Sequence, residues 1–135
     1  MPDYKDDVPI EFKPDNVMFS LSIIADFLGK DWLDRVENRY RTHYTLEASL
    51  EENLHPISPW ISAYRKHLNN RDHPISNNLI KLERLADCIK SFKNQSGFDK
   101  FAEKLKDKKT FLPTVFELEA ATICQRKVFE VEFIP

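Results

Sequence analysis

Glycine is scarce in this sequence, and its scarcity limits the kinds of ligand site that the chain can build. Only two glycines occur among the 135 residues, Gly29 and Gly97, and they lie far apart. The dinucleotide-binding fingerprint and the phosphate-binding P-loop each need several glycines within one short loop. Nucleotide binding by either glycine-rich device is therefore excluded.

Apolar residues recur at helical spacing through most of the chain, which predicts a mainly α fold. The segment 18–28 is apolar almost all round, as in a buried helix, and Gly29 is suited to end it. The next helix has Asp31 as its expected cap and one apolar stripe, formed by Trp32, Leu33, Val36 and Tyr40. The strongest pattern lies between positions 76 and 95, where one stripe comprises Leu79, Leu82, Leu85, Ala86, Ile89 and Phe92.

Three further segments continue the helical pattern. Residues 45–54 predict a short helix, residues 98–105 predict another after Gly97, and Pro113 is expected to open the last helix. Cys88 and Cys124 lie beside apolar residues in these patterns, so both are interpreted as core thiols and no disulfide framework is expected. We expect a bundle of about five to seven helices over residues 17–127, in a single domain.

A four-residue motif, His-Pro-Ile-Ser, occurs twice, at positions 55–58 and 73–76. Each copy precedes a helical pattern. The serine is suited to accept hydrogen bonds from the first turn, and the isoleucine to act as a hydrophobic staple. Pro59 strengthens the first helix start. The motif indicates either helix-start chemistry used twice or a two-helix repeat unit.

Both ends of the chain predict extended structure. Residues 1–16 contain three prolines and read as an arm, with a short strand over Val8–Phe12. Residues 128–134 alternate between apolar and acidic side chains, as in a strand, and 128–135 are assigned to it. A lone strand leaves its backbone groups unpaired. We therefore expect it to pair with Val8–Phe12, with a second copy of the chain, or with a sheet beyond Pro135.

Charge is divided unevenly along a chain whose formal net charge is −2. Residues 1–60 hold 12 acids and 6 lysines and arginines, whereas residues 61–135 hold 10 acids and 14 lysines and arginines. The favoured interpretation is two solvated faces; the alternative is a basic surface on the C-terminal half that meets a polyanion or an acidic partner. If the polyanion is a nucleic acid, this surface is expected to grip the backbone without reading sequence. The candidate contacts are Lys100, Lys104, Lys106, Lys108, Lys109, Arg126 and Lys127.

No catalytic or metal-binding motif is present. The sequence lacks the zinc-protease, nucleophile-elbow and EF-hand patterns, and its four histidines show no helical metal-pair spacing. His55 and His73 precede prolines and are interpreted as turn residues, so no cofactor is expected. The first fifteen residues carry no secretory signal, and the longest apolar stretch is too short to span a bilayer. These features predict a cytoplasmic protein that does not bind membranes.

Residues 110–121, followed by 128–133, resemble the opening helix and first strand of the PD-(D/E)XK nuclease-like superfamily. The shared pattern is a Glu-Leu pair with small residues on the helix, followed by an alternating Val-Phe strand. The resemblance implies that Glu117 would help to hold a catalytic metal if a nuclease core followed. The catalytic Asp and Glu-x-Lys would lie after this strand, so the isolated chain is expected to be inactive.

The leading hypothesis is a non-catalytic helical module that binds another macromolecule, either as the N-terminal part of a larger protein or as a small partner protein. The alternative is the DNA-contacting lead-in region of a metal-dependent PD-(D/E)XK-like nuclease. Self-association through residues 128–134 is a third possibility.

Overall fold

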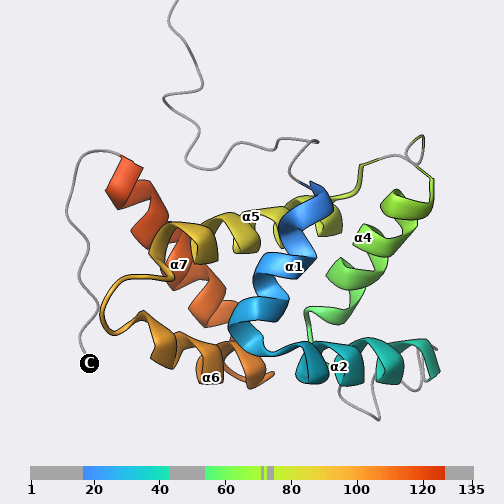
Figure 1. The fold of residues 1–135 in the computed structure, drawn as a ribbon, viewed down its shortest axis with the longest axis horizontal. Coiled ribbons are helices and arrows are strands. Elements are labelled where there is room, and N and C mark those ends of the chain that lie inside the picture. Colours follow the sequence, from blue (N-terminus) through green and yellow to red (C-terminus); the bar gives the residue numbers. More distant parts are fainter. Residues whose placement is uncertain (1–16, 43–53, 71, 73–74, 127–135) are drawn as a thin grey trace, which may run out of the picture.

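Helices make up most of the chain that the structure describes (Figure 1). The computed structural model describes residues 17–42, 54–70, 72 and 75–126. The helices are α1 (Val17–Leu28), α2 (Lys30–Thr42), α4 (Ser58–Asn69), α5 (Asn77–Phe92), η3 (Phe98–Lys100, a 3₁₀ turn), α6 (Phe101–Lys106) and α7 (Phe111–Arg126). The predicted mainly α bundle is thereby confirmed. The predicted strands, the arm, and most of the 45–54 helix lie outside the described residues.

Helix α5 forms the centre of the bundle. Its predicted apolar stripe is buried along its whole length, from Leu79 to Phe92. It packs against α1, α4 and α7, while α2 and α6 close the bundle along one edge (Figure 1). Full burial of a large apolar side chain stabilises a fold by about 1.5–3 kcal/mol. The continuous stripe therefore explains why three helices converge on α5.

Gly29 marks the boundary between α1 and α2, as the sequence predicts. Its φ is +100°, a backbone conformation that L side chains rarely adopt, and it ends α1. Helix α2 then begins at once at Lys30, so Asp31 lies in its first turn and the prediction that Asp31 caps this helix is wrong. Helix α7 begins at Phe111, before Pro113, because a proline within the first turn gives up no intrahelical hydrogen bond.

The repeated His-Pro-Ile-Ser motif behaves differently in its two copies. Ser76 caps α5, since its hydroxyl accepts from the N–H of Leu79 at 3.3 Å. Ser58 lies inside α4 and caps nothing; Ile57 is the capping residue there. Ile57 is fully buried, but Ile75 is exposed, so the prediction that Ile75 acts as a staple is wrong. Only Ser76 confirms the predicted capping role.

A charged contact ties α2 to α4. The Arg65 guanidinium donates two hydrogen bonds to the Glu37 carboxylate, at 2.9 and 3.1 Å, and Arg41 adds a third at 3.1 Å. Burial alone would raise the pKa of Glu37, but the hydrogen bonds and charges of Arg65 and Arg41 outweigh it and lower this pKa below its ordinary value of 4.5. This contact fixes α2, which carries one wall of the pocket described next.

Candidate functional site

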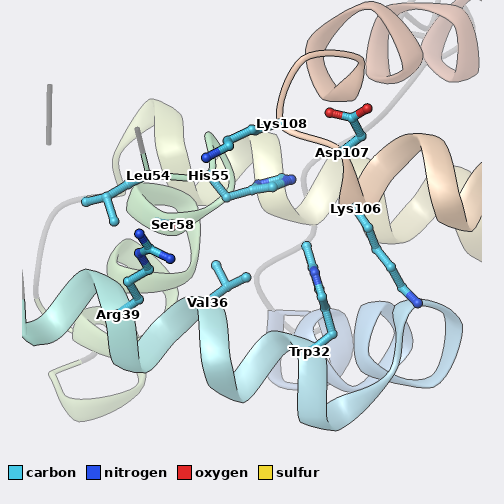
Figure 2. Close-up of a pocket in the computed structure, with 9 residues that line it drawn as sticks. All are labelled: Trp32, Val36, Arg39, Leu54, His55, Ser58, Lys106, Asp107 and Lys108. Atoms are coloured by element: carbon cyan, nitrogen blue, oxygen red, sulfur yellow. The ribbon is translucent and has the colours of Figure 1, made fainter. Parts of the chain in front are cut away.

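A pocket opens where three segments distant in sequence meet (Figure 2). These are α2, the turn that leads into α4, and the loop between α6 and α7. The pocket has a volume of about 270 Å³. Its lining residues are Trp32, Val36, Arg39, Leu54, His55, Ser58, Lys106, Asp107 and Lys108.

His55 joins two of these segments. Its Nε2 lies 2.9 Å from the carbonyl oxygen of Leu105 at the end of α6, and its Nδ1 accepts from the N–H of Ile57 at 3.1 Å. Because a carbonyl oxygen can only accept, Nε2 carries the ring proton. The ring also makes edge contacts with Trp32 and Phe111, at centroid distances of 5.1 and 4.7 Å. These contacts hold the His55 ring in one orientation at the edge of the pocket.

The environment of His55 favours its neutral form. Burial lowers the pKa of His55, and the positive charge of Lys108 lowers it further. The hydrogen bond to the Leu105 carbonyl and the negative charge of Asp107 raise this pKa, but by less. The net result is a pKa below the ordinary value of 6.5. With both ring nitrogens engaged, His55 serves as a structural link between the start of α4 and the end of α6.

The cations of the pocket do not all face the same way. In Figure 2, the guanidinium of Arg39 and the amino group of Lys108 extend toward the part of the pocket beside Leu54 and Ser58. Lys106 extends away from this part, and its Nζ lies 3.7 Å from a carboxylate oxygen of Glu103. The pocket thus has one end with two cations from different segments.

Ser58 lies at this end with its side chain buried. It is 2% exposed, and among the described residues its Oγ has no hydrogen-bond partner. A buried hydroxyl without a partner is uncommon and unfavourable, so each such group calls for an explanation. The N–H of Ser58 is satisfied by the His55 carbonyl, at 3.0 Å, and this leaves the hydroxyl as the open group.

The structure brings together only part of the predicted basic surface. Lys106 and Lys108 reach the pocket, whereas Lys104 lies over the Phe101 ring at 5.1 Å. Arg126 lies at the opposite end of α7, roughly 24 Å along the helix axis from its start. Of the other candidates, Lys100 lies in η3, Lys109 lies in the loop after α6, and Lys127 lies outside the described residues. Sequence reasoning missed Arg39, Trp32 and Ser58, because nothing in their local pattern places them beside the lysines.

Glu117, the residue that the nuclease resemblance singles out, is exposed on α7. Within the described part of the chain, no group of three or more His, Cys, Asp or Glu residues is placed to hold a metal ion. The described residues therefore supply Glu117 with no companion ligands, and the nuclease resemblance stays a prediction.

Helix α7 has a second notable feature, an exposed apolar outer face. Leu112, Phe116 and Ile123 are 45%, 69% and 36% exposed, and Pro113, Ala120 and Cys124 are exposed beside them. We call these six residues the outer face of α7. The opposite side of the helix is buried against the bundle through Phe111, Thr114, Val115, Leu118 and Thr122.

The sequence analysis did not identify the outer face, and its interpretation of Cys124 as a core thiol is wrong. The buried Cys88 receives a hydrogen bond from Thr122 at 3.2 Å and fits the predicted core thiol, but Cys124 is exposed. The available signal was that apolar residues occur on more than one side of α7, although the bundle can cover only one of them.

Comparisons with protein-family models, with curated proteins and with solved structures found no match for this chain. Among the described residues, no helix has the length and apolar character that crossing a membrane requires.

Proposed function

We propose that this protein is a non-catalytic helical module that binds an amphipathic helix of a partner protein along the outer face of α7. The observation that carries the proposal is the exposure of Leu112, Phe116 and Ile123 on one side of a helix whose other side is already in the core. Exposed apolar side chains gathered on one side of a helix mark interaction sites in soluble proteins.

The spacing of the three residues suits a helical partner. Phe116 follows Leu112 by four positions and Ile123 follows Phe116 by seven, so the three side chains lie in one row along the helix. A partner helix recognised in this way presents its own apolar residues at matching three- and four-residue intervals. Phe116, the largest and most exposed of the three, would be the central contact.

Charges beside the outer face favour a particular partner. Lys109 precedes the helix, Glu119 lies in the row between Phe116 and Ile123, Glu117 follows Phe116, and Arg126 ends the helix. A second copy of α7 would place like charges opposite one another in both the parallel and the antiparallel orientation. Like charges in an interface oppose association. The complementary partner is therefore a different helix, with basic residues at its middle and acidic residues at its ends.

Two synthetic helical peptides test the proposal on the full chain. Both carry leucines at the spacing of Leu112, Phe116 and Ile123; one has the complementary charge order and the other has the reversed order. Binding is measured by fluorescence anisotropy of labelled peptide. We expect the complementary peptide to bind at least about tenfold more tightly, because charge order discriminates between partners.

Two serine substitutions of exposed phenylalanines provide the matched comparison. Phe116→Ser removes the central contact, whereas Phe19→Ser makes the same change on α1, where Phe19 is 61% exposed. We expect Phe116→Ser to weaken binding of the complementary peptide about tenfold or more and Phe19→Ser to leave it unchanged. Equal affinity for the two peptides, or equal effects of the two substitutions, contradicts the proposal. A dimer in light scattering that Phe116→Ser dissociates would assign this face to a second copy instead.

A further inference from the structure

A second pocket lies where α1 and α2 meet at a corner and α4 lies beside them (Figure 1). We call it the α1–α2–α4 pocket. We propose that it binds a free α-amino acid with an apolar side chain. The side chain would lie on the apolar floor of the pocket, and the ammonium and carboxylate groups would pair with charged residues of its rim. No residue of α7 lines this pocket, so the site is separate from the helix-binding face.

The floor of the α1–α2–α4 pocket is apolar. Leu33 of α2 and Ile61 and Tyr64 of α4 line the pocket and are buried. Leu21 and Ala25 of α1 also line it and are half-buried. Pockets for small molecules combine an apolar lining of this kind with a few polar groups that fix the orientation of the ligand. The floor therefore suits the apolar part of a ligand.

Three charged side chains on the rim are open to a ligand. Asp26, Lys30 and Asp34 line the pocket, and all three are exposed. In the described part of the chain, the side chain of none of them takes part in a hydrogen bond or an ion pair. Carboxylates and an ammonium group therefore stand at one opening with their hydrogen-bonding capacity available, which favours a ligand that carries both signs of charge.

The spacing of Lys30 and Asp34 suits the two charges of an amino acid. The two residues lie four positions apart on α2, so their side chains are neighbours on one face of the helix. Lysine before the acid is the less favourable order for a direct ion pair at this spacing, which agrees with the lack of one here. An α-amino acid can bridge the two, because its carboxylate accepts from Lys30 while its ammonium group donates to Asp34. Such charge-assisted hydrogen bonds are stronger than those between neutral groups.

The other two charged residues of the lining already satisfy each other. Arg65 donates two hydrogen bonds to Glu37, at 2.9 and 3.1 Å. Hydrogen bonding to Glu37 is the main cause that raises the pKa of Arg65, and Asp34 adds to it only through its charge. The Glu37–Arg65 pair therefore closes one side of the pocket, and Asp26, Lys30 and Asp34 are the groups that can take up a ligand.

The size of the pocket and the chemistry of its rim together favour a free amino acid. The volume of about 360 Å³ lies near the lower end of the range for small-molecule pockets, which is roughly 300–1,000 Å³. An amino acid fits this volume, whereas a dinucleotide does not. Only a free amino acid carries both charges on one carbon, because residues inside a peptide have neither and each terminus keeps one. The proposed ligand is therefore a small metabolite and not a segment of another protein.

Titration of the full chain with L-phenylalanine tests the proposal. Methyl NMR resonances of Leu33 and Ile61 report occupancy, because both side chains line the floor. We expect a dissociation constant of about 1 mM or below. Phenethylamine lacks the carboxylate and hydrocinnamate lacks the ammonium group, so each should bind at least about tenfold more weakly than phenylalanine.

Four exposed side chains of α2 supply matched variants. Lys30 and Asp34 line the pocket, whereas Arg35 and Asp31 do not. We expect Lys30→Gln and Asp34→Asn each to weaken phenylalanine binding about tenfold, because a hydrogen bond between charged groups is lost. Arg35→Gln and Asp31→Asn should leave the binding unchanged. Thermal melts should show that all four variants stay folded, because surface substitutions change stability little.

The two analogues identify the charge that each residue recognises. Phenethylamine has no carboxylate, so Lys30→Gln should not weaken its binding, and hydrocinnamate has no ammonium group, so Asp34→Asn should not weaken its binding. Failure of phenylalanine to bind at about tenfold above the expected dissociation constant overturns the proposal. Equal binding of phenylalanine and both analogues, or equal effects of Lys30→Gln and Arg35→Gln, overturns it as well. None of these results depends on peptide binding by the outer face of α7.

Discussion

At the scale of single residues, His55 links the fold to the pocket. The sequence predicts a turn residue, and its place before α4 agrees with that interpretation. The hydrogen bond to the Leu105 carbonyl joins positions that are 50 residues apart, which no local pattern predicts. The bond also positions the start of the loop that carries Lys108, so one histidine sets the relative place of two pocket walls.

The lowered pKa of His55 predicts a pH-dependent contribution to stability. The folded state holds the neutral ring, so the unfolded chain binds the proton more readily. The contribution is therefore complete above the ordinary pKa of 6.5 and is lost as the pH falls below it. Urea unfolding of the wild type at about pH 7.5 and about pH 5.5 should show this loss. In His55→Gln, the free energy of unfolding at the higher pH should be about 1–3 kcal/mol lower than in the wild type. This free energy should also change less between the two pH values than it does in the wild type.

If His55→Gln and the wild type lose the same stability between the two pH values, the titrating group is elsewhere. The comparison between the two proteins isolates His55, because every other titratable group is common to both.

The two serines of the repeated motif give a second prediction at this scale. Ser76→Ala removes a cap and should lower the free energy of unfolding by about 0.5–2 kcal/mol. Ser58→Ala removes a buried hydroxyl that has no partner among the described residues, so it should leave this free energy unchanged or raise it slightly. Chemical denaturation of both variants measures the difference. An equal loss in both would mean that Ser58 has a structural role that the described contacts do not show.

At the scale of secondary-structure elements, apolar periodicity predicts where the helices lie. It does not predict which side of every helix packs against the bundle. The stripe of α5 predicts both the helix and its burial, because only one side is apolar. Helix α7 has apolar residues on more than one side, so the pattern predicts a helix without saying which side the bundle covers. Asp31 and Ser58 show the same limit at helix starts, where a shift of one or two residues changes a cap into a first-turn residue.

The two sides of α7 predict opposite responses to substitution. Leu118 is fully buried, so Leu118→Ala should lower the free energy of unfolding by about 2–5 kcal/mol. Phe116 is largely exposed, so Phe116→Ser should change it by no more than about 0.5 kcal/mol. Urea unfolding measures both. A large loss of stability in Phe116→Ser would mean that this side chain belongs to the fold, and would remove it from the binding surface.

At the scale of the whole molecule, the fold class was predictable and the pocket was not. Apolar periodicity fixes the number and type of most elements, since each helix must bury one side. The pocket depends on how α2, the start of α4 and the loop after α6 meet, and these segments are distant in sequence. The lysine-rich stretch drew attention to Lys106 and Lys108, but only the tertiary structure places Lys108 in the lining of the same pocket as Arg39 and Ser58.

Binding of a partner helix to the outer face of α7 can be followed in methyl NMR spectra of the full chain. The charge-complementary peptide is added to protein with labelled leucine and isoleucine methyl groups. We expect shifts at Leu112 and Ile123, on the outer face, and little change at Leu82 and Leu105, in the core. An absence of shifts, or shifts confined to residues away from α7, would contradict it.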